Sequence, residues 1–155
     1  MASLKDKIIV LTGASRGIGA AAARELATDG AHLVLCARSA DACAETKAAV
    51  EALGATAEVH GFEVADFDAA KSFVDGVLAD HGRIDILINN AGLTRDNLAM
   101  RMKDDEWQQV LDVNLSAAFR LSRGVLRGMM KARWGRIVTI TSVVGATGNP
   151  GQVNY

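Results

Sequence analysis

A cluster of glycines between an apolar run and a helical segment carries the clearest chemistry in this sequence. The run ends at Thr12, and glycines follow at 13, 17 and 19. Glycines at this spacing let the backbone approach a pyrophosphate closely, and the helix that follows offers free N–H groups and the positive end of its dipole. We therefore expect a dinucleotide here, its phosphates held by Gly13, Ser15, Arg16, Gly17, Ile18 and Gly19.

The residues after the second apolar run, His32–Ala37, bear on which dinucleotide binds. An acidic residue at this point would hydrogen-bond the ribose 2′-hydroxyl and select NAD. This sequence has Arg38 and Ser39 instead, and a guanidinium at that place can hold a 2′-phosphate, with Arg16 assisting. The pattern favours NADPH. NAD stays open because Asp41 is close by, and a merely solvated Arg38 is the simpler alternative.

The spacing of the apolar residues predicts the strands and helices that position these side chains. This spacing alternates along the chain between a strand-like and a helix-like pattern. Short, continuously apolar or β-branched runs predict strands at Lys7–Thr12, His32–Ala37, Thr56–Val64, Asp85–Asn89 and Arg136–Thr141. Helical spacing predicts helices at Gly17–Asp29, Ser39–Leu53, Asp66–Asp80 and over most of 103–132. Ser39 and Asp66 are expected N-caps. Residues 143–155 are expected to form a loop, with room for the start of another helix.

Strands that alternate with helices are joined by right-handed crossovers into a parallel sheet, and continuously apolar strands indicate that both faces of the sheet are covered. The pattern therefore predicts an α/β fold with a Rossmann-type, doubly wound parallel sheet. The length of 155 residues fits a single domain over 1–155.

Composition excludes several classes of protein. Half of the residues are hydrophobic and 23% are charged, which excludes a disordered tail or a fibre. Two cysteines, Cys36 and Cys43, are too few for a disulfide scaffold, and neither has an identifiable acid–base partner. The mixed charges of the first seven residues do not fit a signal peptide, and no apolar run is long enough to span a membrane. We expect a soluble, cytoplasmic protein.

The net charge of only -1 argues against nucleic-acid binding. The charged residues are nevertheless unevenly distributed along the chain. No acidic residue follows Asp112, whereas six bases do. On a helical projection, eight apolar residues of 115–130 occupy one face. Four of the bases share the opposite face: Arg120, Arg123, Arg127 and Lys131. We expect a core face and a basic face, the latter either solvated or docking an acidic protein. His32, His60 and His81 lack metal-ligand spacing, so no metal site is expected.

Together these motifs resemble the short-chain dehydrogenase/reductase family, in the family's order and spacing. Thr12–Gly19 fits its TGxxxGxG loop, and Asn89–Gly92 fits the NNAG that ends its fourth strand. Asn114, Ser142 and Tyr155 fit its active-site asparagine, serine and tyrosine. Within the family, the stretches 92–98, 129–137 and 142–155 are most similar to those of bacterial 3-oxoacyl-[acyl-carrier-protein] reductases.

The resemblance implies a reaction and a role for each of these residues. The reaction is reduction of a 3-oxo group with NADPH, with Tyr155 as the general acid, Ser142 bonding the carbonyl oxygen and Asn114 holding a proton-relaying water. Further implied cofactor contacts are Glu63, Val64, Asn90, Ala91, Gly92 and Tyr155 itself. The implied partners are a substrate carried by an acidic acyl carrier protein and further copies in a homotetramer. We expect Arg127, Lys131 and Arg133 to dock the carrier.

Two departures from the family pattern bear on these expectations. Glu63 stands where the family has an aspartate facing the adenine, and it is one methylene longer. The family tyrosine belongs to YxxxK, and this sequence ends at Tyr155, so we expect the fold to cover the family's first five strands and the isolated chain to be inactive. The fifth strand would then expose an apolar edge. The alternatives are an acetoacetyl-CoA or other ketone reductase of the same family, and a non-catalytic dinucleotide-binding fragment.

Overall fold

Five parallel strands form a single sheet in the computed structural model, which describes residues 3–155. The strands are β1 (Ile8–Thr12), β2 (His32–Ala37), β3 (Thr56–Gly61), β4 (Ile86–Asn89) and β5 (Arg136–Thr139). Their spatial order is β3-β2-β1-β4-β5, and each neighbouring pair is parallel. The chain therefore winds outward from β1 first to one side and then to the other, which confirms the doubly wound α/β fold.

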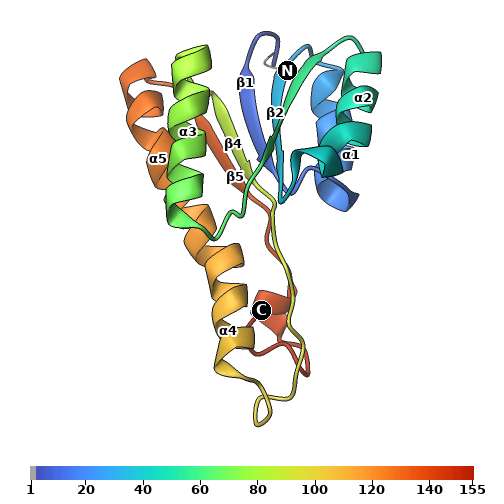
Figure 1. The fold of residues 1–155 in the computed structure, drawn as a ribbon, viewed down its shortest axis with the longest axis vertical. Coiled ribbons are helices and arrows are strands. Elements are labelled where there is room, and N and C mark those ends of the chain that lie inside the picture. Colours follow the sequence, from blue (N-terminus) through green and yellow to red (C-terminus); the bar gives the residue numbers. More distant parts are fainter. Residues whose placement is uncertain (1–2) are drawn as a thin grey trace.

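Helices cover both faces of this sheet, as Figure 1 shows. On one face lie α1 (Gly17–Ala27) and α2 (Ala44–Ala52), the latter preceded by a 3₁₀ turn, η1 (Ala40–Cys43). On the other face lie α3 (Phe67–His81) and α5 (Ala117–Ala132). This three-layer arrangement leaves the carboxyl ends of the strands free to carry the loops on which ligands bind in such folds.

The core consists of two layers because successive side chains of a strand point to opposite faces. Ile9 and Leu11 of β1 are fully buried in the layer beneath α1 and α2. Val10 between them is buried in the other layer, against residues of α3 and α5 such as Val77 and Val125. Burial of such side chains on both faces explains why the strands read as continuous apolar runs.

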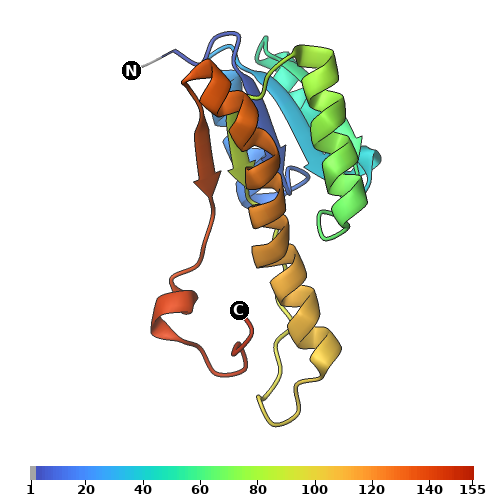
Figure 2. The same cartoon turned by 90° about the vertical axis from the view of Figure 1, so that its left-hand side faces the viewer.

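A long run of helix lies beside the sheet and continues below it in Figure 1, where a second segment faces its lower part. This helical rod comprises α4 (Asp104–Leu111), a π-helical turn, η2 (Asp112–Ser116), and α5. The facing segment follows β5 and contains only one short helix, α6 (Val144–Thr147); Figure 2 shows it lying opposite the rod. Residues 143–155 therefore form mostly loop, as the sequence predicts.

Most predicted elements are present, with shifts at their ends. Asp66 caps α3 as expected, since its carboxylate accepts the Ala69 N–H at 2.9 Å. Ser39 does not act as a side-chain cap, and the turn after it is 3₁₀ rather than α-helical. β3 ends at Gly61 instead of Val64. At Gly61 the strand passes close to the η1 turn, since a Cβ at this position would lie only 2.6 Å from the backbone nitrogen of Ala40.

The expectation that α5 has one apolar core face is only half correct. Ala117, Leu121, Val125 and Met129 are buried, but four other apolar side chains of this region are exposed: Leu115, Phe119, Leu126 and Met130. β5, an edge strand, is exposed along its length, in agreement with the expected apolar edge. Among the helices of residues 3–155, none combines the length and the apolar character that a membrane span requires.

Candidate functional site

The glycine loop brings two stretches of backbone into direct contact after β1. Gly13 has a φ of +66°, a conformation that favours glycine, and a Cβ there would lie 2.9 Å from the Cα of Ala91. A Cβ on Gly19 would lie 2.1 Å from the Gly13 carbonyl oxygen, which no side chain tolerates. The first turn of α1 therefore packs directly onto the loop, and this contact requires glycine at both positions.

The amino end of α1 is suited to an anion. The N-cap residue, Arg16, has extended backbone and makes no side-chain capping hydrogen bond, and no acidic residue lies in the first turn. The first N–H groups of an α-helix lack intrahelical partners, so those of the first turn remain available to an external acceptor. Ile18 and the Arg16 side chain are exposed beside this end of the helix. The geometry therefore fits the pyrophosphate of a dinucleotide.

Thr12 and Asn90 fasten this loop to the segment that follows β4. The buried Thr12 hydroxyl donates to the Ile88 carbonyl at 3.3 Å and accepts the N–H groups of Asn90 and Ala91, both at 3.0 Å. The Asn90 amide donates in return to the carbonyls of Thr12 and Gly13, at 3.0 and 3.1 Å. Sequence reasoning assigned no role to Thr12, although its place at the end of a strand before the glycines was a usable signal.

The predicted 2′-phosphate and adenine residues lie at the carboxyl ends of β2 and β3. Arg38 directly follows β2, is exposed, and forms no ion pair within residues 3–155. The two strand ends are joined because the Phe62 N–H donates to the Ala37 carbonyl at 2.9 Å. Glu63 is exposed and Val64 is buried. Within residues 3–155 the Glu63 carboxylate forms no ion pair either, so a guanidinium and a carboxylate without ion-pair partners in this range flank this end of the sheet.

Asn114 lies inside η2 and contacts the segment after β4. Its Oδ1 accepts the Leu93 N–H at 2.9 Å, and its Nδ2 donates to the Leu93 carbonyl at 2.9 Å. A Cβ on Gly92 would lie 3.3 Å from the same Oδ1. π-Helical turns are rare and frequent at functional sites, and this one presents the predicted asparagine to the loop.

Ser142 and Tyr155 lie in the segment that follows β5. Ser142 is half-buried, and its hydroxyl accepts the Val144 N–H at 3.2 Å. Tyr155 is 40% exposed, and its N–H donates to the Gln152 carbonyl at 3.1 Å. Within residues 3–155 their side chains form no hydrogen bond with each other or with Asn114. The structure therefore shows no direct contact that joins the three predicted catalytic residues within residues 3–155, and their grouping stays a prediction.

Hydrogen bonds that the sequence did not indicate attach this segment to the chain after β4. Asn154, which is buried, donates from Nδ2 to the carbonyls of Arg95 and Glu106 at 3.0 and 3.3 Å. The Asn97 N–H donates to the Gly151 carbonyl at 2.8 Å. These contacts hold the residues before Tyr155 against α4. The position of the tyrosine therefore depends on a hydrogen bond between Asn154 and Glu106, which are more than forty residues apart in the sequence.

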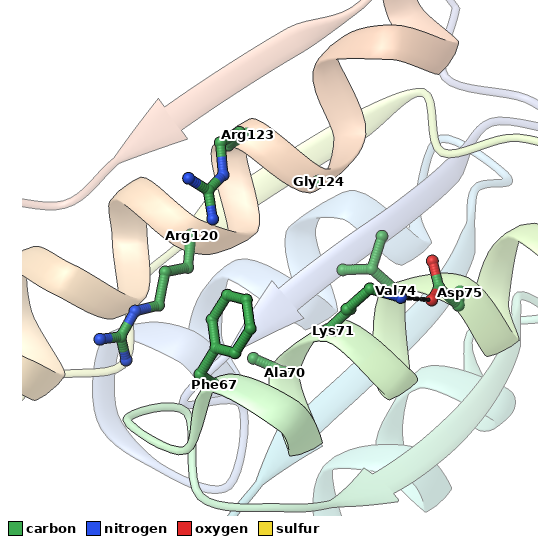
Figure 3. A pocket seen from close by; sticks show the side chains of 8 residues that line it. All are labelled: Phe67, Ala70, Lys71, Val74, Asp75, Arg120, Arg123 and Gly124. Atoms are coloured by element: carbon green, nitrogen blue, oxygen red, sulfur yellow. Dashed lines mark hydrogen bonds and ion pairs between the residues drawn. The ribbon is translucent and has the colours of Figure 1, made fainter.

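The four bases predicted to form one face of α5 differ in their surroundings. Figure 3 shows Arg120 and Arg123 beside a shallow groove of about 210 Å³ between α3 and α5. Arg120 donates to the Ala65 carbonyl at 2.8 Å and lies over the Phe67 ring, so it is half-buried. Arg127 and Lys131 are exposed. Only part of the expected basic face is therefore available to a partner.

Comparison with known proteins agrees with this geometry. The profile of the family described as short chain dehydrogenase matches residues 7–155. The chain is 49% identical to the 3-oxoacyl-[acyl-carrier-protein] reductase FabG of Salmonella typhimurium and 48% identical to that of Escherichia coli, over 99% of this chain and 62% of each relative. The chain thus spans 62% of the length of these curated relatives.

Solved structures extend the comparison to the fold and to bound dinucleotides. A metagenomic short-chain oxidoreductase in complex with NADP superimposes with a TM-score of 0.95 at 39% identity, over 99% of this chain and 70% of that one. An NAD⁺-bound xylitol dehydrogenase superimposes with a TM-score of 0.93 at 32% identity, over 99% and 60%. With the glycine loop, the NNAG segment and the strand order already in place, the family profile leads to one conclusion: this chain belongs to the short-chain dehydrogenase family.

Proposed function

We propose that this chain forms the dinucleotide-binding part of a cytoplasmic, NADPH-dependent reductase that converts 3-oxoacyl groups on acyl carrier protein to 3-hydroxyacyl groups. The observation that carries the proposal is the 49% identity, over 99% of the chain, to reductases named for this substrate. A structural neighbour with lower identity, 32%, is a dehydrogenase of another substrate, xylitol. The open helix end and the unpaired Arg38 support the choice of cofactor.

The chain's own residues would bind and orient the cofactor. The first-turn N–H groups of α1 would hold the pyrophosphate, and Arg38 with Arg16 would hold the 2′-phosphate that distinguishes NADPH from NADH. Asn90, Ala91 and Gly92 would line the ribose and nicotinamide, mostly through backbone, while Glu63 and Val64 would border the adenine. When bound, the cofactor would supply a hydride to the 3-carbon of the substrate.

Three residues would act on the substrate oxygen. Ser142 would donate a hydrogen bond to the carbonyl and stabilise the charge that develops on its oxygen. Tyr155 would deliver the proton to that oxygen as the general acid. Asn114 would hold a water on the proton path, which requires its amide to be fixed; the two bonds to Leu93 supply that fixation. These assignments rest on the family's motif.

We further propose that the exposed bases Arg127, Lys131 and Arg133 dock the acidic carrier protein, and that the protein is a homotetramer. Opposite charge across an interface steers association and raises its rate. The four exposed apolar side chains in and next to α5 support association between copies, because exposed apolar patches of this kind commonly mark interfaces. A tetramer would cover part of the same helix, which leaves its basic carboxyl end, from Arg127 to Arg133, as the carrier surface.

The test combines intact mass with turnover. If the protein from its native source has a mass of 16.3 kDa, any activity belongs to this chain alone. If its mass is larger, the activity belongs to a longer protein that contains this chain. NADPH oxidation is then followed with a 3-oxoacyl group on acyl carrier protein, with acetoacetyl-CoA and with a simple ketone. A kcat/KM about tenfold or more higher for the carrier-bound substrate supports the proposal.

Each other outcome favours an alternative. A preference for acetoacetyl-CoA or the simple ketone would indicate a different ketone reductase of the family. NADPH binding without turnover would indicate a non-catalytic dinucleotide-binding protein. Absence of both binding and turnover would overturn the proposal altogether.

A further inference from the structure

Three histidines that are distant in the sequence gather around one glutamate, between the β3 edge of the sheet and the carboxyl end of α3. His32 is the first residue of β2, Glu58 and His60 belong to β3, and His81 is the last residue of α3. Glu58 pairs with Val34, whose side chain is buried beneath α3. Because side chains alternate, His32, Glu58 and His60 point to this same face. Spacing along the chain did not indicate this grouping, since the fold supplies it.

The carboxylate of Glu58 is the centre of the cluster. Its Oε1 lies 3.1 Å from Nε2 of His81 and 3.2 Å from Nε2 of His60, and its Oε2 lies 4.0 Å from Nε2 of His32. The rings of His32 and His81 have centroids 4.7 Å apart. One nitrogen or oxygen from each of His32, Glu58 and His81 lies within 4.8 Å of the other two. The three side chains are between 19% and 31% exposed.

His32 leaves one nitrogen unsatisfied. Its Nδ1 lies 2.7 Å from the Thr56 hydroxyl, and its Nε2 is buried without a hydrogen-bond partner in the described part of the chain. With Nδ1 donating to Thr56, Nε2 carries a lone pair beside Glu58 and His81.

We propose that His32, Glu58 and His81 bind a divalent transition-metal ion, with Zn²⁺ preferred. Two imidazoles and a carboxylate form a donor set that zinc uses in proteins. Tetrahedral zinc with bonds of about 2.0–2.1 Å places its donors roughly 3.4 Å apart. Glu58 Oε1 lies 3.1 Å from His81 and its Oε2 lies 4.0 Å from His32, and one donor from each residue lies within 4.8 Å of the other two, so the side chains must move closer together to complete the site.

Binding changes the bonding of the cluster in a defined way. The ion replaces the hydrogen bond between His81 and Glu58 with a metal bond to each, and it takes the free lone pair of His32. Both imidazoles ligate in the neutral form, and any displaced proton passes to solvent. His60 stays outside the first shell and holds the Glu58 carboxylate, as second-shell partners of metal ligands do. Water completes the fourth position.

The position of the site indicates what the ion does. His32 and His81 lie at the end of the molecule where the strands begin, opposite the carboxyl ends that carry the glycine loop, and Figure 1 shows the end of α3 on that side. An ion there joins the end of α3 to β2 and β3. Its expected effect is on the stability of this corner rather than on the cofactor.

The test is made on a tag-free chain, because its three histidines all belong to the cluster and a histidine tag would compete. After treatment with a chelator and its removal, Zn²⁺ uptake is measured by competition with a chromophoric chelator, and thermal unfolding is followed with Zn²⁺ and with Mg²⁺. We expect one Zn²⁺ per chain at micromolar concentration. At a hundredfold excess over Kd, Zn²⁺ should raise Tm by about 5–10 °C, and Mg²⁺ should leave it unchanged.

Variants and a second metal identify the ligands. His60→Asn, which removes a partner of the Glu58 carboxylate but no ligand, should weaken Zn²⁺ binding by about tenfold, and His32→Asn and His81→Asn, which each remove a ligand, should weaken it more than that. Co²⁺ bound to the unmodified chain should give visible d–d bands without a thiolate charge-transfer band, a readout that needs no variant to fold. Binding that is unchanged in both variants, or no stoichiometric uptake and no shift in Tm for the unmodified chain, would overturn the proposal.

Discussion

The side-chain amide of Asn114 forms two hydrogen bonds with the backbone of a single residue, Leu93, accepting its N–H and donating to its carbonyl, both at 2.9 Å. This pair of bonds closes the segment after β4 against η2, the π-helical turn that interrupts the long helical rod. Asn114, which we propose to lie on the proton path, therefore also holds in place the backbone that we propose to line the cofactor.

Replacing Asn114 should destabilise the fold as well as affect any reaction. Asn114→Ala leaves the partly buried N–H and carbonyl of Leu93 without their partner, and we expect a loss of about 1–3 kcal/mol in the free energy of unfolding. Urea denaturation measures this. The exposed Gln108, whose side chain bonds to Asp112 alone among residues 3–155, is the matched control, and Gln108→Ala should change the free energy by less than about 0.5 kcal/mol. Equal effects of the two changes would contradict the structural role.

Arg38 should discriminate between the two dinucleotides. Removal of a charge-assisted contact to a phosphate should raise the Kd for NADPH by about 10- to 100-fold in Arg38→Ala, while the Kd for NADH should change by less than about twofold. Titration of the nicotinamide fluorescence measures both constants. Arg24→Ala, an exposed base on α1, is the control and should change neither. Equal weakening of both cofactors would mean that Arg38 does not contact the 2′-phosphate.

The sequence predicted those features of the site that short stretches of residues encode, and it missed those that depend on contacts between distant segments. The strands, the glycine loop and the Asp66 cap follow from short stretches of sequence, and the structure has all of them. Thr12 and Asn90 were both inside recognised motifs, but their mutual bonds needed the pairing of β1 with β4, which no local pattern encodes.

Long-range packing accounts for what the sequence missed. Arg120 fits a basic helical face on a projection, yet the approach of α3 turns it toward the Ala65 carbonyl and the Phe67 ring. His32 and His81 are separated in the sequence by one complete crossover and the helix of the next, and their ring centroids lie 4.7 Å apart in the fold. Neither relationship is visible until the helices are placed on the sheet.

Charge reversal at the exposed bases of α5 should affect only the carrier-bound substrate. In a protein with measurable turnover, Arg127→Glu combined with Lys131→Glu should raise KM for a 3-oxoacyl group on acyl carrier protein by about tenfold, an effect that salt weakens. KM for a small thioester should change by less than about twofold. The matched control reverses Arg24 and Lys47 on the opposite side of the sheet. Equal changes for both substrates would exclude a docking role.

Glu106 of α4 should make the free energy of unfolding depend on pH. Its carboxylate accepts the Lys103 N–H at 2.8 Å and the Asn97 amide at 3.1 Å, and these bonds lower its pKa. A carboxyl whose pKa is lower in the folded state stabilises the fold above its unfolded pKa of about 4.3, and this stabilisation is lost as the pH falls through the folded pKa.

The comparison that tests this uses Glu106→Gln. The variant should be less stable than the unmodified chain at neutral pH, and the gap in unfolding free energy should narrow as the pH falls from about 5 to about 3. Glu45→Gln is the control, because Glu45 is exposed and accepts no hydrogen bond within residues 3–155. A gap that stays constant with pH would show that the Glu106 bonds contribute no linkage.

The fold should protect the two thiols from reagents in the solvent. Cys36 and Cys43 are both fully buried, and burial raises the pKa of each, most strongly that of Cys36. Only the thiolate reacts, so a buried thiol with a raised pKa requires local opening first. Disulfide-exchange labelling near pH 8 should be at least about 10²-fold slower in the native chain than in denaturant. Single Cys→Ser variants assign each rate, and fast native labelling of either cysteine would show a reactive, accessible thiol.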